Sequence, residues 1–344
     1  MMLTVRILFI LFLSISLSSC LEFDTLLNTI MRNYDKTTQT IIVESDDGFL
    51  YRSFAVRGVT ANSSSKIEKI DINTGVNTTI LGSGNLATTD GIGLAAEFKK
   101  ITAMAFVPGS PQKLIIGDSC SLREVNLSTL QVTTKAGLSD TCNDLNGVGT
   151  AARFANVRGI IVSGTTLFVA TANQIKQVDL ATYTVSSYIG SDTAGDTDAI
   201  GPAAAITPYG MTKLGDFIYL LDGAQKIKKI STVDLSVTTI AGQSVSGTEY
   251  NSQDGVGTSA TLLIKSINAA TTDNSKYLYF TENQKIRKLN LITNEITTII
   301  DSYNWDEDIN SNQLSQAKVY RPCGIVFTSK GLFISNLYGV RRLK

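Results

Sequence analysis

The chain of 344 residues is long enough for two ordinary domains or for one large all-β domain. Its 30 basic and 30 acidic side chains cancel, and only 17% of residues are charged, which argues against nucleic acid as a partner. The sequence has no histidine. This excludes Ser-His-Asp and Cys-His catalysis and every zinc site with a histidine ligand.

The first 19 residues are expected to form a signal sequence. Arg6 supplies a short positive region, and the apolar run over residues 7–17 is shorter than the about 20 residues that a membrane-spanning helix needs. The segment ends in Leu17-Ser18-Ser19-Cys20, which resembles the lipobox of bacterial lipoproteins. The resemblance implies cleavage before Cys20 and acylation of that cysteine, which would bind it to membrane lipid. The alternative is an ordinary secretory signal with an unrelated cysteine.

Residues 20–35 are then expected to be a lipid-anchored tether, followed by one folded region over residues 36–344. Leu21 follows Cys20, so the chain lacks the adjacent Asp that the enterobacterial sorting rule uses to withhold a lipoprotein from the outer membrane. We therefore expect a protein of the bacterial cell envelope, anchored in the outer membrane. The sequence leaves open whether it faces the periplasm or the cell surface.

A pattern that begins at Asp90, DGIGLAAEF, recurs along the folded region. Further copies begin at Asn146, Asp198 and Asp254, so the period is 52 to 56 residues. Taken by itself, the first copy has the glycine spacing of a dinucleotide-binding turn. Such a fingerprint belongs to a βαβ unit, however, whereas a structural turn recurs with the unit that it closes. We therefore expect no NAD or other cofactor. The following residues are assigned a structural turn role: Asp90, Gly91, Gly93, Gly147, Gly149, Asp254, Gly255 and Gly257.

A second pattern repeats with a similar period. Its first aliphatic residues lie 52 to 59 positions apart, at Ile67, Leu122, Ile175, Ile227, Ile286 and Val340. Each copy follows a short apolar run, and most precede a polar turn and a Thr-, Val- and Ile-rich run, which predicts four strands in each unit. Six such units predict an all-β, six-bladed β-propeller of four-stranded antiparallel blades.

Over residues 36–344 these patterns resemble the NHL repeat family. The matching stretches are Asp90-Gly91-Ile92-Gly93, Ala96, Phe98 and residues 146–154, 158–162, 238–242 and 286–289. The resemblance implies a propeller that serves as an interaction platform. The phenylalanines of the pattern, Phe98 and Phe154, are expected to pack between neighbouring blades.

The sixth unit ends at Lys344, directly after its third strand, so one outer strand is missing. The segment DKTTQTIIVE, residues 35–44, has the composition of an outer strand and precedes the first full unit. We predict that it pairs onto the last blade and closes the ring, because closure removes open sheet edges.

Three cysteines remain beyond Cys20. Cys120 lies between the second and third strands of its unit and Cys142 in the connection that leaves it, so both are expected on one face, where a disulfide is possible. The alternative is two unbonded thiols. Cys323 is expected to be a small buried hydrophobe.

Basic residues follow the first aliphatic position in five units, while Glu68 interrupts the series. They are Arg123, Lys176, Lys228, Arg287 and Arg341. They either form a partner-binding rim for an anionic protein, glycan or lipid, or cover apolar blade edges with their stems while their heads reach water. Trp305, the sole tryptophan, lies in the acidic stretch 304–310 and is a further candidate contact, the alternative being an anchored insertion.

These features favour a monomeric, non-enzymatic binding module with a protein or glycan partner. The alternative is an envelope enzyme of the propeller lyase or lactonase type, with an oxygen-ligand metal site in the central channel. Calcium is the metal considered, with candidate ligands at the ends of second strands: Asp118, Asp222, Glu282 and Asn336. A third possibility is a structural envelope component without a specific ligand.

Overall fold

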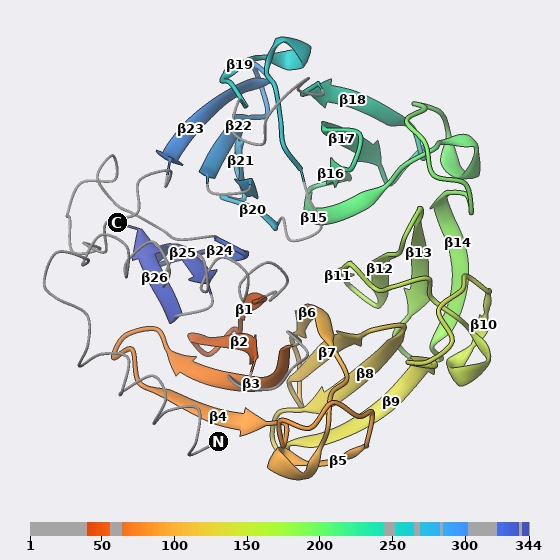
Figure 1. Cartoon of the computed structure of the whole chain (residues 1–344), viewed down its shortest axis with the longest axis vertical. Coiled ribbons are helices and arrows are strands. Elements are labelled where there is room, and N and C mark those ends of the chain that lie inside the picture. The colour runs from red at the N-terminus through yellow and green to blue at the C-terminus, as the bar shows by residue number, and fades with distance from the viewer. Residues whose placement is uncertain are drawn as a thin grey trace, which may run out of the picture.

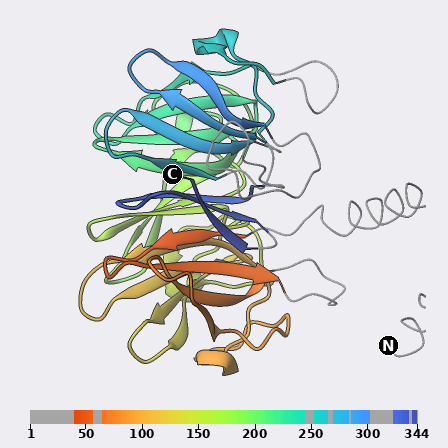
Figure 2. The same ribbon diagram turned by 90° about the vertical axis from the view of Figure 1, so that its left-hand side faces the viewer.

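The computed structural model describes residues 40–55, 64–243, 252–264, 269–282, 285–301, 322–336 and 339–343. The signal sequence, Cys20, the tether and Trp305 lie outside these residues. Six antiparallel sheets surround a central axis (Figure 1), so the predicted six-bladed β-propeller is confirmed. Figure 2 shows the same sheets from the side, where their strands run across the thickness of the ring seen in Figure 1.

Each blade is numbered from its inner to its outer strand. The first contains β1 (Ile42–Glu44), β2 (Phe49–Ala55), β3 (Ser64–Asp71) and β4 (Asn77–Leu81). The second contains β6 (Ile101–Val107), β7 (Lys113–Asp118), β8 (Ser121–Asn126) and β9 (Gln131–Gly137). The third contains β11 (Gly159–Ser163), β12 (Thr166–Ala170), β13 (Gln174–Asp179) and β14 (Thr184–Gly190).

The remaining blades follow the same plan. The fourth contains β15 (Pro208–Leu214), β16 (Phe217–Asp222), β17 (Lys226–Ser231) and β18 (Val237–Ala241). The fifth contains β20 (Ala270–Thr272), β21 (Tyr277–Glu282), β22 (Lys285–Asn290) and β23 (Glu295–Asp301). The sixth contains β24 (Gly324–Thr328), β25 (Gly331–Asn336) and β26 (Gly339–Leu343), so the described sheets have three to five strands rather than always four.

The recurring Asp-Gly pattern forms a small extra strand and one turn of 3₁₀ helix. In three blades the strand lies outside the outer strand, as β5 (Gly91–Ile92), β10 (Gly147–Val148) and β19 (Gly255–Val256). The 3₁₀ turns within the four copies of the pattern are η2 (Gly93–Ala95), η3 (Gly149–Ala151), η4 (Gly201–Ala203) and η5 (Gly257–Ser259). Gly93 opens its turn at φ +58°, which a glycine adopts without steric cost. The pattern therefore closes a blade and opens no nucleotide-binding helix.

The core lies between blades, because both faces of a middle strand are covered by neighbours. In β7 the sequence KLIIGD is buried at every position after Lys113, so it reads as a continuous apolar run rather than an alternating one. Phe98 is fully buried between the first and second blades, and Phe154 between the second and third. The predicted position of these two phenylalanines is confirmed.

The prediction that residues 35–44 complete the last blade is wrong for the part of that segment that the structure describes. Strand β1 pairs with β2, as Val43 opposite Tyr51 shows, and is the inner strand of the first blade. The turn between them is tight, with the Ser45 amide donating to the Phe49 carbonyl at 2.9 Å. An Asp-Gly turn of this kind specifies a hairpin and sets β1 beside its sequence neighbour.

The ring closes where the first blade meets the sixth, with β1 lying beside β24 (Figure 1). The hydroxyls of Thr40 and Ser335 are 3.1 Å apart, and Ile42 and Phe333 share an apolar cluster across this seam. Gly324 lets the two blades approach, because a Cβ there would lie 2.8 Å from the Thr40 carbonyl oxygen. Closure thus rests on contacts between two blades that keep their own strands.

Candidate functional site

The basic residue of the second blade is buried in an ion-pair network. Arg123 is 0% exposed, and its guanidinium donates to Asp118 at 3.1 Å and to Asp90 at 2.8 Å. Asp90 also accepts the Thr134 amide at 2.8 Å, and the guanidinium lies 4.7 Å from the centre of the Phe98 ring. The cation therefore ties together the end of one strand, the Asp-Gly turn and the outer strand.

The fifth blade repeats this network. Arg287 is 0% exposed and donates to Glu282 at 2.7 Å and to Asp254 at 3.0 Å, while Asp254 accepts the Thr298 amide at 2.9 Å. Partial burial works to raise the pKa of Asp254, but the Thr298 amide, the Thr298 hydroxyl and Arg287 outweigh it and hold that pKa below its ordinary value. The turn aspartate is thus bound as a carboxylate.

Lysines take the same place in the third and fourth blades. Lys228 donates to Asp198 at 2.6 Å and lies 2.8 Å from Asp196. Burial alone would lower the pKa of Lys228, but these two carboxylates raise it above its ordinary value. Lys176 faces Asn146 at 3.1 Å in place of the turn aspartate, and burial lowers its pKa. Asp144, 3.7 Å from Lys176, and Asp192 favour the charged lysine but do not outweigh this burial.

The first blade also has a buried ion pair, but here the acidic residue is on the third strand and the basic residue on the second. Glu68 takes the position of the cation on the third strand, and Arg52 on the second strand contacts it at 2.7 Å. Asn77 donates to the other oxygen of Glu68 at 3.1 Å. The interruption of the basic series by Glu68 is therefore compensated within its own blade.

The prediction of a partner-binding rim is wrong for four of the five basic residues proposed for it, all of which the structure describes. Arg123, Lys176, Lys228 and Arg287 are at most 1% exposed, so their heads meet carboxylates rather than a partner or water. Arg341, on β26, is half-buried. The four buried cations therefore tie together elements of their own blades.

The candidate calcium ligands are also used within their own blades. Each accepts hydrogen bonds from backbone amides. Asp118 accepts the Lys100 amide at 2.8 Å, and Asp222 accepts the amides of Thr207 and Ala224 at 2.7 and 2.8 Å. Glu282 accepts the Leu263 amide at 2.6 Å, and Asn336 accepts the Gly339 amide at 3.1 Å. Burial raises the pKa of Asp118 and of Asp222, against the pull of these amides. Among the described residues, no group of three or more His, Cys, Asp and Glu side chains could hold a metal ion. The expected ligand set is therefore not assembled in the channel.

A disulfide joins Cys120 to Cys142, the pairing considered from the sequence, with their Cα atoms 5.2 Å apart. It links the turn between β7 and β8 to the connection that leaves the blade. Cys323, outside this disulfide, is 7% exposed next to β24.

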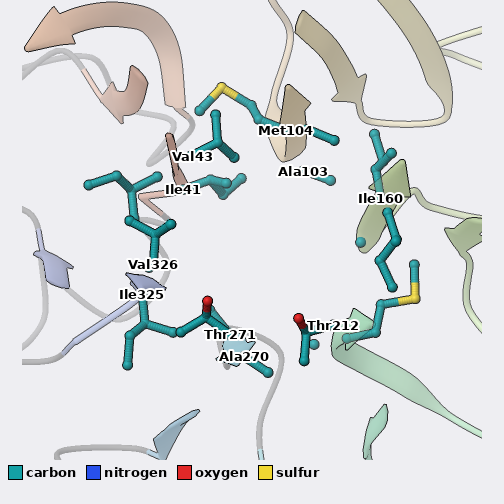
Figure 3. A pocket seen from close by; sticks show the side chains of 18 of the residues that line it. Ile41, Val43, Ala103, Met104, Ile160, Thr212, Ala270, Thr271, Ile325 and Val326 are labelled. Atoms are coloured by element: carbon teal, nitrogen blue, oxygen red, sulfur yellow. The ribbon is translucent and has the colours of Figure 1, made fainter. Parts of the chain in front are cut away.

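The central channel contains a cavity of about 450 Å³ lined by the inner strands of all six blades (Figure 3). Figure 3 shows a wall of mainly aliphatic side chains, with Ile160, Met104 and Ile325 among them. Thr212 and Thr271 contribute hydroxyl groups to the same wall. The channel is therefore a largely apolar space with a few hydrogen-bonding groups.

Among the described residues that line this cavity, the charged side chains lie towards the ends of the inner strands. Arg158 and Tyr209 are lining residues at the beginnings of β11 and β15, and the guanidinium lies 4.8 Å from the centre of the Tyr209 ring. Glu44 and Lys213 are lining residues near the ends of β1 and β15. Burial raises the pKa of Glu44, and Asp46 adds to the rise. The two ends of the cavity therefore differ in charge.

Sequence reasoning did not single out the residues of this cavity. The channel lining comes from inner strands about 55 residues apart, and their short apolar runs look the same as those of buried strands. One signal was present: Arg158 interrupts an otherwise uncharged set of strand beginnings. The repeat alone gives no reason for a cation there.

No protein-family model matches this chain, and no curated protein matches it either. Among solved structures, a Bacteroides thetaiotaomicron protein of unknown function is 15% identical over 88% of both chains, with a TM-score of 0.44. An auxiliary nutrient binding protein of the same organism is 13% identical over 90% of this chain and 99% of that chain, with a TM-score of 0.43. Similarity at this level says nothing about ligand or activity. No helix among the residues that the structure describes is long and apolar enough to cross a membrane.

Proposed function

We propose that this protein is a non-enzymatic binding module of the bacterial cell envelope, with an NHL-type propeller anchored in the outer membrane through acylated Cys20. Its ligand site is the central channel. The observation that carries the proposal is the cavity of about 450 Å³ to which every blade contributes. Small-molecule sites in proteins are typically apolar cavities of roughly 300–1,000 Å³ with a few placed polar groups.

Two further features support export and anchoring. The lipobox-like sequence ending at Cys20 supplies a site for lipid, and several fatty chains give stable membrane attachment. The Cys120–Cys142 disulfide suits an oxidising compartment outside the cytoplasm. The loops and channel of the propeller would then face an environment that contains envelope or external ligands.

Native mass spectrometry tests the binding proposal. Protein extracted from its own cells in mild detergent should carry a small molecule that denaturation releases. Thr212→Phe, which adds a ring to the channel wall and narrows the cavity, should lose that molecule while keeping the circular dichroism spectrum of the wild type. Ala270→Leu serves if the first variant does not fold. A bound mass that both filling variants retain, or no bound mass at all, would contradict the proposal.

Anchoring is tested separately. The mature N-terminal peptide should begin at Cys20 with added acyl mass, and Cys20→Ser should move the protein from the membrane to the soluble fraction. An unmodified peptide that spans Ser19 and Cys20 would rule the anchor out. Protease treatment of intact cells, with a periplasmic protein as control, then shows which side of the membrane the propeller faces.

A further inference from the structure

We propose that the ligand of the central channel is an amphipathic organic anion, with its apolar body between the inner strands and its anionic group at Arg158. This inference rests on the proposed function, which places the ligand site in the channel. It adds the chemical class of the ligand and the residue that recognises its charge.

Arg158 departs from the repeat at a position where the fold needs no cation. In four blades the residue after this position pairs near the end of the second strand, as Gly159 with Ala170, Ala103 with Gly117, Gly210 with Leu221 and Gly324 with Ser335. By this register the equivalents of Arg158 are Thr102, Tyr209 and Cys323, and all are uncharged. Since three blades form the same strand beginning without a charge, stability of the repeat does not explain Arg158.

The guanidinium of Arg158 is held in place without neutralisation of its charge. It donates to the carbonyls of Ala172 at 3.2 Å and of Pro208 at 3.1 Å, and the ring of Tyr209 lies beside it. Within the described part of the chain, no carboxylate forms an ion pair with Arg158. The buried cations Arg123 and Arg287, by contrast, each contact two carboxylates.

A half-buried, positioned guanidinium with its charge uncompensated is a recognition group for carboxylate, sulfonate or phosphate oxygens. The adjoining wall is apolar, since Ile160 on β11 and Met211 on β15 both line the cavity. The far end of the cavity has a different character, since the acidic Glu44 and the basic Lys213 both line it there and their charges oppose each other. A ligand with an anionic group at Arg158 and an apolar body along the axis would match both the guanidinium and the apolar wall.

A matched pair of fluorescent probes tests the inference. Anilinonaphthalene sulfonate carries one negative charge, and phenylnaphthylamine has the same aromatic body without it. We expect the wild type to bind the sulfonate about tenfold or more tightly than the uncharged probe, the range that a hydrogen-bonded charge provides. Arg158→Met should remove that advantage and change phenylnaphthylamine binding by less than about twofold, whereas Arg158→Lys should retain part of it.

Arg153→Met is the matched control. Arg153 also donates to two backbone carbonyls, those of Thr150 and Ala152, but it lies beside the outer turn η3 rather than in the cavity. It should leave the binding of both probes unchanged, and Thr212→Phe should weaken both. Near-ultraviolet circular dichroism must match the wild type, because loosely packed states bind such probes without a site.

Equal sulfonate binding by the wild type and Arg158→Met would overturn the inference, as would an equal loss in Arg153→Met or no loss in Thr212→Phe. The same holds if the wild type does not bind the sulfonate at all. In that case a small molecule that copurifies and is displaced by Thr212→Phe would leave the proposed function standing. The absence of such a molecule would remove both.

Discussion

At the scale of single residues, the recurring basic residue of the third strand has a structural role: it binds carboxylates of its own blade. The sequence predicts the position of this basic residue but places its charged group at the surface, because a strand with alternating apolar and charged residues normally has one solvent-exposed face. In a propeller both faces of the third strand are covered, so Arg123 must find its counter-charge inside. Its partner Asp90 lies 33 positions earlier, a separation at which the sequence gives no pairing signal.

Removal of such a cation should be costly. We expect Arg123→Met to lower the free energy of unfolding by about 3–5 kcal/mol at neutral pH, because Asp118 would remain buried without its counter-charge. Urea unfolding followed by circular dichroism measures the change. Arg153→Met should alter stability by at most about 0.5 kcal/mol. A loss below about 1 kcal/mol for Arg123→Met would show that the pair does not fasten the blade.

The turn aspartates predict acid sensitivity. The pKa of Asp254 is depressed in the folded protein, so its stabilising contribution is present above the ordinary pKa of about 3.9 and is lost as pH falls through the folded value. Wild type should therefore be more stable than Asp254→Asn above about pH 5, and the difference should narrow below about pH 3. Unfolding midpoints of both proteins across this range measure it. A constant difference would contradict the assignment.

At the scale of the elements, the periodicity of apolar runs was sufficient to predict the blades. It was insufficient to tell an inner strand from an outer one, because both are short and rich in β-branched residues. The misplaced segment, β1, illustrates this: its composition matched an outer strand, but the turn between Ser45 and Phe49 decided its neighbour. The Asp47-Gly48 pair was the available signal, since such pairs favour hairpins.

The Cys120–Cys142 disulfide covalently links the β7–β8 turn of the second blade to the connection that leaves this blade. Reduction, or replacement of both Cys120 and Cys142 with alanine, should cost about 3 kcal/mol, since the bond closes a loop of 22 positions in the unfolded chain. Thermal unfolding with and without reductant measures the effect. The double variant should not respond to reductant, and a wild type that also does not respond would argue that the bond contributes nothing to stability.

At the scale of the whole molecule, stability depends on the seam between the first and sixth blades. We expect Gly324→Ala to weaken the seam, because the added Cβ would clash with the Ser335 hydroxyl and lie 2.8 Å from the Thr40 carbonyl oxygen. Its melting temperature should fall and limited proteolysis should quicken. Gly339→Ala, on β26 of the same blade, is the control, since its Cβ would meet nothing nearer than 3.8 Å. Equal behaviour of the two variants would place the weak point of the ring elsewhere.

The seam also has a consequence for the order of folding. Thr40 and Ser335 are 295 positions apart, whereas strands within a blade meet their neighbours after a short turn. Bringing such distant segments together costs about 1.5 kcal/mol more loop-closure entropy than joining segments one blade apart. We therefore expect the blades to assemble from local contacts before the seam forms. In that interval the sides of β1 and β24 that finally face each other would be uncovered and open to association with other chains.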